Sequence, residues 1–242
     1  MNSIENTIPY HVAVIPDGNR RWAKQRGEKP WKGHKAGAEI IEELSREALK
    51  MGVKCITFWG SSKDNLQKRP MEEKRELLRI YEEYFKKLIN SSDIFDNETK
   101  IQLIGRWEEQ FPNKLKKILK EGAEKTKHHT HSFLNFLLAY SGDDDILQAV
   151  KEIKNKARNS DHDIEVTEDF FQENLLSAPL PEVDLIIRTG TEGDPHNSAG
   201  FLMWQTQNSQ FYFTDKLFPD FDSREFKKAL NDYANRERRL GK

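Results

Sequence analysis

The stretch "HVAVIPDGNRRWAK" (residues 11–24) decides the fold, because an apolar run meets a dense polar cluster within it. Residues 11–15 alternate and are β-branched, which predicts a strand, and residues 19–26 favour a helix. The polar cluster lies between and at the start of these elements and consists of Asp17, Gly18, Asn19, Arg20 and Arg21. Such a junction is either an ordinary strand-to-helix connection or the floor of an active site.

The same alternation of strand and helix continues along the chain. Strands are expected at 53–60, 101–105, 132–140 and 183–190 and in the region 201–213. Helices are expected at 36–51, 72–89, 112–127, 168–176 and 223–239, with a further one opened by Asp143, Asp144 and Asp145, and with Ser223 as the last N-cap. This order predicts an α/β fold with a mainly parallel central sheet flanked by helices. No repeat or linker divides residues 1–242, so one domain is expected.

The composition fits a globular protein with a highly charged surface. Of the 242 residues, 36% are hydrophobic and 33% charged, and no apolar run is long enough to cross a bilayer. The first residues lack the pattern of a secretory signal. Cys55 is the only cysteine, which excludes a disulfide framework and favours the reducing cytoplasm.

The charge balance bears on the choice of partner. A net charge of −1 gives no global attraction for nucleic acid. Residues 20–35, however, are rich in Lys and Arg and contain one acid, Glu28. This local cationic region is either a solvated helix face or a binding surface for anions.

Polar residues follow the predicted strands, where open parallel sheets place their ligands. They are Asp17 to Arg21 after the first strand, Ser61, Ser62, Asp64, Asn65 and Arg69 after the second, Ser141 to Asp143 after the fourth, and Arg188 to Gly190 after the fifth, with Gly33 and His34 at the start of the long helix. Arginine forks and backbone amides suit phosphate oxygens, and one carboxylate suits Mg²⁺ beside a diphosphate. This pattern indicates a diphosphate-binding, Mg²⁺-assisted enzyme, unless the polarity of the strand ends is a coincidence.

Two common nucleotide motifs are absent from the sequence. No GxxxxGK[ST] occurs, which excludes the usual ATPase loop, and no GxGxxG follows a strand, which argues against dinucleotide binding. The "HHTH" at 128–131 matches no zinc-site spacing, so a polar turn is expected there.

Apolar side chains form a second signal. They are Ile40, Ile41, Leu44, Leu77, Leu78, Tyr81, Phe85 and Leu88 on the helices, and Phe58, Phe133, Phe136 and Leu138 on the strands. Core packing is the ordinary explanation for each of them. If the diphosphate carries an apolar chain, some of them must line a channel.

Five ordered motifs resemble the cis-prenyltransferases, the undecaprenyl diphosphate synthase family. These are "HVAVIPDGNRRWA" (11–23), "GHKAG" (33–37), "SSKDNLQKRP" with "MEEKRELL" after it, "AYSGDDDI", and "DLIIRTG…GFLMWQ…FYFTDKLFPDF". The resemblance spans about residues 10–230. It implies a homodimer with a parallel sheet and a hydrophobic tunnel.

The resemblance also implies an activity. Such enzymes join isopentenyl diphosphate to an allylic diphosphate, here expected to be farnesyl diphosphate, and make cis double bonds. The default product is a long-chain polyprenyl diphosphate such as undecaprenyl diphosphate, which could bring peripheral membrane contact. The alternatives are a member making a short or branched product, and a non-catalytic partner subunit, which typically lacks the aspartate that stands here at Asp17.

Residue roles are carried over from the resemblance alone. Asp17 is expected to hold Mg²⁺, and Asn65 to lie beside the reacting carbons. The residues expected to bind the substrates are Gly18, Asn19, Arg20, Arg21, Trp22, His34, Ser62, Arg69, Arg188, His196 and Ser198. The proton acceptor is not identified by the sequence.

Four positions depart from the usual bacterial pattern of this family. Pro30 replaces an Arg, with Lys29 and Lys32 nearby, and Asp143 replaces another. Gln210 stands where a metal-binding Glu is common, and "DPHNSAGF" (194–201) replaces an Arg-x-Ser segment. His196 and Ser198 are the expected substitutes for that segment. Asp194 or Glu192 could replace the missing carboxylate, unless this segment is a surface loop.

Overall fold

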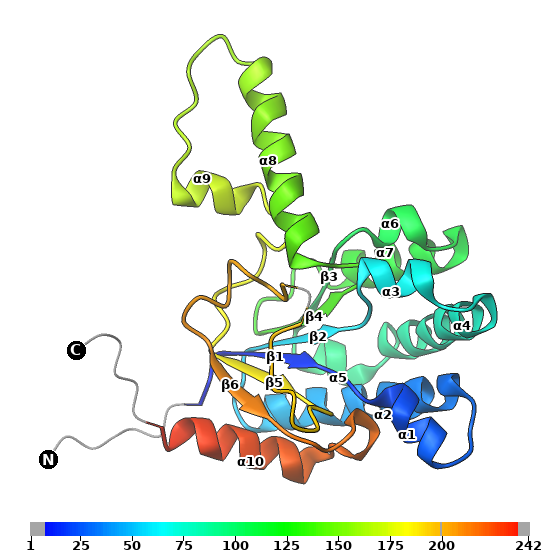
Figure 1. Ribbon diagram of the computed structural model, residues 1–242. Coiled ribbons are helices and arrows are strands. Elements are labelled where there is room, and N and C mark those ends of the chain that lie inside the picture. The colour runs from blue at the N-terminus through cyan, green and yellow to red at the C-terminus, as the bar shows by residue number, and fades with distance from the viewer. Residues whose placement is uncertain (1–7, 199, 237–242) are drawn as a thin grey trace, which may run out of the picture.

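Six parallel strands form one sheet with the order β3-β4-β2-β1-β5-β6 in the computed structural model, which describes residues 8–198 and 200–236 (Figure 1). The strands are β1 (His11–Ile15), β2 (Cys55–Trp59), β3 (Thr99–Ile104), β4 (Ser132–Leu137), β5 (Leu185–Arg188) and β6 (Gln210–Phe213). The expected α/β class and parallel sheet are therefore confirmed.

The helices connect and cover these strands. They are α1 (Asn19–Gln25), α2 (Pro30–Lys50), α3 (Lys63–Lys68), α4 (Met71–Leu88), α5 (Ser92–Asp96), α6 (Trp107–Gln110), α7 (Asn113–Lys125), α8 (Gly142–Arg158), α9 (Glu168–Glu173) and α10 (Ser223–Ala234), with a 3₁₀ turn η1 (Phe218–Asp220). In Figure 1, α8 and α9 extend away from the body of the molecule. None of the helices in the described ranges combines the length and apolar character that a bilayer crossing requires.

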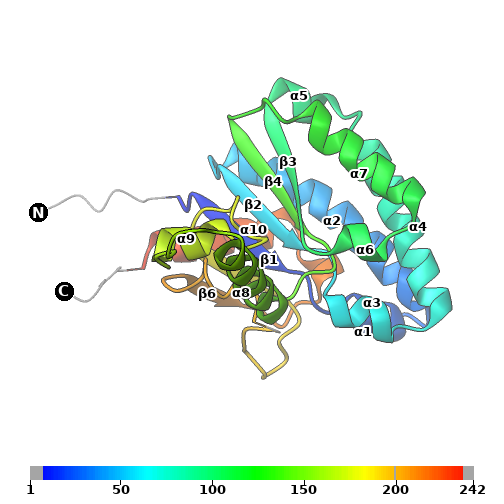
Figure 2. The same ribbon diagram turned by 90° about the horizontal axis from the view of Figure 1, so that it is seen from above.

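Both faces of the sheet are covered, which explains why its central strands are apolar at successive positions. Val12 and Val14 of β1 pack into a cluster with α2, α4, α7 and α10. Ala13 and Ile15 belong to a second cluster on the opposite face. Figure 2 shows α2, α4 and α7 lined up along one side of the sheet.

The parallel register brings the carboxyl ends of the strands together. Ile15 of β1 is paired with Arg188 of β5, and Val14 with Phe58 of β2. The polar residues that follow β1, β2 and β5 therefore emerge at the same edge of the sheet.

Helix α2 begins at Pro30 rather than at the expected residue 36. Proline is favoured in the first turn of a helix because its missing N–H has no partner there anyway. The extra turns bring Gly33 against α1, where a Cβ on Gly33 would lie 1.9 Å from the carbonyl oxygen of Asn19. The Gly-His pair thus lies inside the helix, and its glycine allows the close contact of α1 and α2.

Two expectations near the carboxyl terminus were wrong. Residues 201–208 form turns, and only Gln210–Phe213 of that region is a strand. Phe201 and Leu202 are instead fully buried in the cluster on the second face. They are apolar because they pack in this core, although they form no strand. The N-cap of α10 is Asp222, whose carboxylate accepts hydrogen bonds from Arg224 and Glu225 N–H, and not Ser223. Residues 237–239 of the expected last helix lie outside the described residues.

His11 forms a buried polar link between β1 and its neighbours. Its Nδ1 donates to the Pro181 carbonyl (3.0 Å), so Nε2 is free to accept from the Thr57 hydroxyl (2.7 Å). Burial lowers the pKa of His11 to about 4, which keeps the ring neutral.

The folded protein should lose stability in mild acid because of His11. The unfolded chain protonates the ring near its ordinary pKa of 6.5, so stability falls as the pH drops from about 6.5 towards 4. Between about pH 7 and pH 5 this residue alone should cost about 2 kcal/mol. Urea unfolding at both pH values measures this loss. The loss should shrink in His11→Asn, and an equal loss in that variant would contradict the assignment.

Candidate active site

A cleft of about 1080 Å³ lies at the carboxyl edge of the sheet, between β1, β2, α1 and α3. Eleven of the residues predicted from the sequence line it. These are Asp17, Gly18, Asn19, Arg20, Arg21, His34, Ser62, Asn65, Arg69, Arg188 and Ser198. The parallel register thus brings together residues from segments that are far apart in the sequence.

Asp17 and Arg188 form the central ion pair of this cleft. Arg188 Nη2 lies 3.1 Å from Asp17 Oδ2, and the arginine side chain is only 8% exposed. Its Nη1 donates to the His196 carbonyl at 2.6 Å, while its buried Nε has no partner among the described residues. A buried guanidinium with a spare donor can bind an anion that enters the cleft.

Arg21 connects this pair to the following loop. Its guanidinium lies 3.3 Å from Asp17 Oδ1, donates to the Gly190 carbonyl at 2.6 Å, and pairs with Glu192 at 2.9 Å. Two carboxylates therefore share one arginine. Glu192, and not Asp194, is the acid that the loop 189–198 brings to this cluster.

Gly18 makes the sharp turn from β1 into α1. Its φ is +102°, and its N–H donates to Asp17 Oδ1 at 2.6 Å. A Cβ here would lie 2.7 Å from Leu217 Cδ2. Glycine is required both by the backbone conformation and by the close packing.

A second cluster surrounds the buried carboxylate of Glu73 on α4. Arg69 Nη1 lies 3.1 Å from Glu73 Oε1 and 2.8 Å from His34 Nε2. Arg20 approaches the same carboxylate at 3.5 Å. Glu73 therefore orients two arginines and one histidine at the cleft wall.

The titration of this second cluster follows from its geometry. Burial lowers the pKa of His34, and the adjacent Arg69 lowers it further. His34 and the two arginines hold the pKa of Glu73 below its usual range, so the carboxylate stays charged.

The cleft has an excess of positive charge. Its lining includes the cations Arg20, Arg21, Lys24, Lys68, Arg69 and Arg188, against the carboxylates Asp17, Glu28 and Asp64. A concave site with surplus arginine attracts multiply charged anions.

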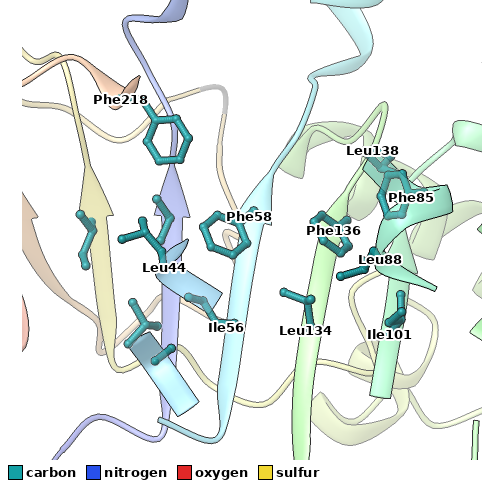
Figure 3. Close-up of a cluster of buried hydrophobic side chains, with 14 of the residues drawn as sticks. Leu44, Ile56, Phe58, Phe85, Leu88, Ile101, Leu134, Phe136, Leu138 and Phe218 are labelled. Carbon is teal, nitrogen blue, oxygen red and sulfur yellow. The ribbon is translucent and has the colours of Figure 1, made fainter. Parts of the chain in front are cut away.

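An apolar cavity adjoins the cleft. It shares Pro16, Asn19, His34 and Gly60 with the cleft. Its further lining lies between α2, α4 and β4 and includes Ala38, Ile41, Leu77, Ile80, Tyr81, Tyr84, Phe85, Phe136 and Leu138. Figure 3 shows Phe85, Phe136 and Leu138 grouped there, and Phe218, which also lines the cavity, above β1. An apolar cavity of about 50 Å³ therefore lies where the sequence predicts a channel, whereas Leu44 and Phe58 line neither this cavity nor the cleft.

Comparison with known proteins identifies this combination of charged cleft and apolar cavity. The family model for undecaprenyl diphosphate synthases matches residues 15–241. The chain belongs to this family.

Relatives of this family are similar over almost the whole chain. A tritrans,polycis-undecaprenyl-diphosphate synthase (geranylgeranyl-diphosphate specific) from Methanopyrus kandleri is 35% identical, over 98% of this chain and 86% of the relative. An isoprenyl transferase from Clostridium perfringens is 36% identical, over 98% and 92%. Lavandulyl diphosphate synthase from Lavandula x intermedia, solved with dimethylallyl diphosphate, superposes with a TM-score of 0.88 at 29% identity over both full chains. The protein is thus a prenyltransferase of the cis-prenyl diphosphate synthase type.

Two predicted residues of this prenyltransferase do not line the cleft. The Trp22 indole N–H donates to Asp220 at 2.7 Å, and its ring stacks beneath Arg26 at 4.0 Å. His196 reaches the site through its carbonyl, which accepts from Arg188, while its half-exposed ring turns towards Asp194. Contacts with the rest of the protein therefore occupy both side chains.

The departures from the family pattern also have defined places. Gln210 lies at the start of β6, and its Oε1 accepts from Arg236 at 3.1 Å, so it does not line the cleft. Asp143 is exposed at the start of α8. Pro30 lines the cleft. The Cys55 thiol is buried in the sheet, as expected.

Glu73 and Lys63 hold cleft residues in place without lining the cleft themselves, and sequence reasoning missed both. Glu73 lies four residues after Arg69, but Arg69 is in the extended link before α4, so helical spacing does not indicate this pair. Lys63 pairs with Asp144 at 2.6 Å, which ties α3, and with it Asn65, to the start of α8. This second contact spans 81 residues of sequence and has no local signal.

Removal of the buried Glu73 carboxylate should destabilise the fold. Glu73→Ala leaves Arg69 and Arg20 without their shared partner and should lower the free energy of unfolding by about 3 kcal/mol. Glu83→Ala on the same helix is the control, because its pair with Arg79 is exposed and should be worth less than about 1 kcal/mol. Equal effects of the two substitutions, measured by urea unfolding, would contradict the structural role of Glu73.

Proposed function

We propose that this prenyltransferase condenses isopentenyl diphosphate with an allylic prenyl diphosphate in the cationic cleft. The observation that carries the proposal is the Asp17, Arg188 and Arg21 cluster beside an apolar cavity. A diphosphate needs the charged cluster for binding, and a prenyl chain needs the apolar cavity.

The allylic diphosphate is assigned to the Asn19, Arg69 and His34 side of the cleft. Asn19 and His34 line both the cleft and the apolar cavity, and Arg69 lies beside His34 in the cleft. The prenyl chain would enter the cavity while its diphosphate stays with the arginines. Isopentenyl diphosphate is assigned to Arg188 and Ser198 on the opposite side, near β5.

The proposed reaction forms one carbon–carbon bond. The allylic C1–O bond breaks, and its electron pair leaves with the diphosphate. The isopentenyl double bond attacks C1, and an oxygen of the departing diphosphate takes a proton from C2 of the isopentenyl unit, so that a new double bond forms between C2 and C3. Arginines that face the leaving diphosphate stabilise the charge that develops there, and the shared cleft orients both substrates.

We also propose that the reaction depends on Mg²⁺. No group of three or more potential metal ligands occurs among the described residues. Mg²⁺ typically uses one or two protein carboxylates together with substrate phosphate oxygens, and Asp17, half-exposed in the cleft, fits that mode. When bound, the ion would neutralise charge on the departing diphosphate. Because both Asp17 oxygens contact cations or an amide in this structure, the carboxylate would exchange a partner for the metal.

The assembly and compartment belong to the same proposal. A homodimer is supported by α8, which presents Leu147 and Val150 at 58% and 51% exposure on one face. The single buried cysteine supports action in the cytoplasm. The allylic primer differs among relatives, so farnesyl diphosphate and the short or branched alternatives are to be distinguished by assay. A non-catalytic role is disfavoured because Asp17 lies in the cleft.

An incorporation assay tests the function directly. Wild-type protein with Mg²⁺, labelled isopentenyl diphosphate and dimethylallyl, farnesyl or geranylgeranyl diphosphate should yield a labelled prenyl diphosphate. Arg188→Ala should lower kcat/KM at least 100-fold, because it removes a buried anion-binding fork. The exposed Arg224→Ala is the control and should retain wild-type activity. No product from any primer would contradict the proposal.

A further inference from the structure

Three neighbouring strands, β3, β4 and β2, are each followed by a charged residue at the carboxyl edge of the sheet. Arg106 follows β3, Asp144 lies in the first turn of α8 after β4, and Lys63 begins α3 after β2. None of these three residues lines the cleft. They form a network separate from the pair of Asp17 and Arg188, which follows β1 and ends β5.

Asp144 joins the two cations of this network through its two carboxylate oxygens. Its Oδ1 accepts a hydrogen bond from Lys63 Nζ at 2.6 Å, and its Oδ2 accepts one from Arg106 Nε. The Asp144 side chain is only 14% exposed. Although burial acts in the opposite direction, the hydrogen bonds from Lys63 and Arg106 hold the pKa of Asp144 below its usual range. The carboxylate therefore stays charged at neutral pH.

Arg106 is fixed by two further contacts, which make Asp144 a firm anchor. Its Nη1 pairs with Glu109 of α6 at 2.7 Å, and its Nη2 donates to Gln148 Oε1 of α8 at 2.9 Å. Gln148 lies four residues after Asp144, so both residues share one face of α8. The guanidinium cannot turn away from Asp144 without losing these contacts.

Helix α3 depends on this anchor because little else holds it. Leu66 is the only buried residue of the six in this helix. One of its ion pairs, Lys68 with Asp64, lies within the helix itself. Among the residues that the structure describes, the pair of Lys63 and Asp144 is the one ion pair that connects α3 to another element. So short a helix has no stability of its own, and its tertiary contacts therefore set its position.

The segment around α3 carries two residues of the cleft. Ser62 caps the helix by accepting a hydrogen bond from the Asn65 N–H at 3.0 Å, and both residues line the cleft. Just after the helix, Arg69 pairs with Glu73 at 3.1 Å. The segment is thus tied to the rest of the protein at Lys63 and at Arg69, and Asn65 lies between these ties.

We propose that the pair of Lys63 and Asp144 is a clamp that positions Asn65 for the condensation step, an inference that rests on the proposed function. Both members are positioning residues, because neither lines the cleft. Loss of the pair lets α3 shift and moves Asn65 away from the reacting carbons, whereas the arginines that bind the diphosphates keep their own partners. A displaced group beside the reacting atoms lowers the rate of reaction more than the affinity for substrate.

Steady-state kinetics of Lys63→Met test the inference, because methionine keeps much of the bulk of lysine and removes its charge. The kcat should fall about tenfold, whereas the KM for isopentenyl diphosphate should change less than about twofold. Lys63→Arg keeps the charge and should retain most of the wild-type kcat. Lys63→Gln replaces Lys63→Met if the latter does not fold.

A double variant tests whether the two residues act through one contact. Asp144→Asn should lower kcat as Lys63→Met does, and the two substitutions together should lower it no further than either alone. Lys120→Met is the matched control. Lys120 pairs with Glu108 at 2.7 Å between α7 and α6, lines no part of the cleft, and should leave kcat at the wild-type value.

Hydrogen exchange without substrate tests the clamp independently of activity. The amides of Lys63–Lys68 should exchange faster in Lys63→Met than in wild type, because the helix opens more often without its anchor. The amides of Met71–Leu88 in α4 should keep their wild-type rates, and Lys120→Met should resemble wild type throughout.

The outcomes separate this inference from the proposed function. If wild type is active, a folded Lys63→Met with the wild-type kcat, or with wild-type exchange in α3, would overturn the inference. A KM that rises as much as kcat falls, a Lys63→Arg variant as slow as Lys63→Met, or additive losses in the double variant would also overturn it. If wild type gives no product with any primer, the proposed function fails, and the inference about its condensation step fails with it.

Discussion

The ion pair between Asp17 and Arg188 is the contact on which the rest of the site depends. It exists because β1 and β5 are parallel neighbours in a register that pairs Ile15 with Arg188. The carboxylate that follows one strand then meets the guanidinium that ends the other. A buried arginine needs this partner before substrate arrives, and its unpartnered Nε still leaves a donor for an anion.

The fold separates charge from apolar surface along one path. Gly33 lets α1 approach α2 closely, so the basic helix α1 forms a wall of the cleft. From there α2 and α4 run away from the charged edge and enclose apolar side chains against β4. Glu73 stands at the transition, where it holds Arg69 and His34 beside the entrance to the apolar cavity. A molecule with a charged head and an apolar tail matches this arrangement, which is why prenyl diphosphates are the natural substrate class.

The α/β class, the parallel sheet and ten of the eleven cleft residues could be predicted from strand patterns and strand-end polarity, which are local signals. Ser198 was predicted only from the family resemblance. The early start of α2 could not be predicted from the sequence, since it depends on the contact between Gly33 and α1. Residues 201–208 were predicted as a strand because a buried apolar segment that packs on a sheet has a composition similar to that of a buried strand. The outward position of Trp22 was also unforeseen, since Asp220 is 198 residues away in the sequence.

A crystal structure with isopentenyl diphosphate, a non-reactive thio analogue of the allylic diphosphate and Mg²⁺ tests the central claim most directly. The account predicts one diphosphate against Arg188 and Ser198 and the other beside Arg69 and His34, with Asp17 next to the metal. The prenyl chain should point between α2 and α4 towards Tyr84. Diphosphates bound outside this cleft, or a prenyl chain directed away from the apolar cavity, would contradict the account.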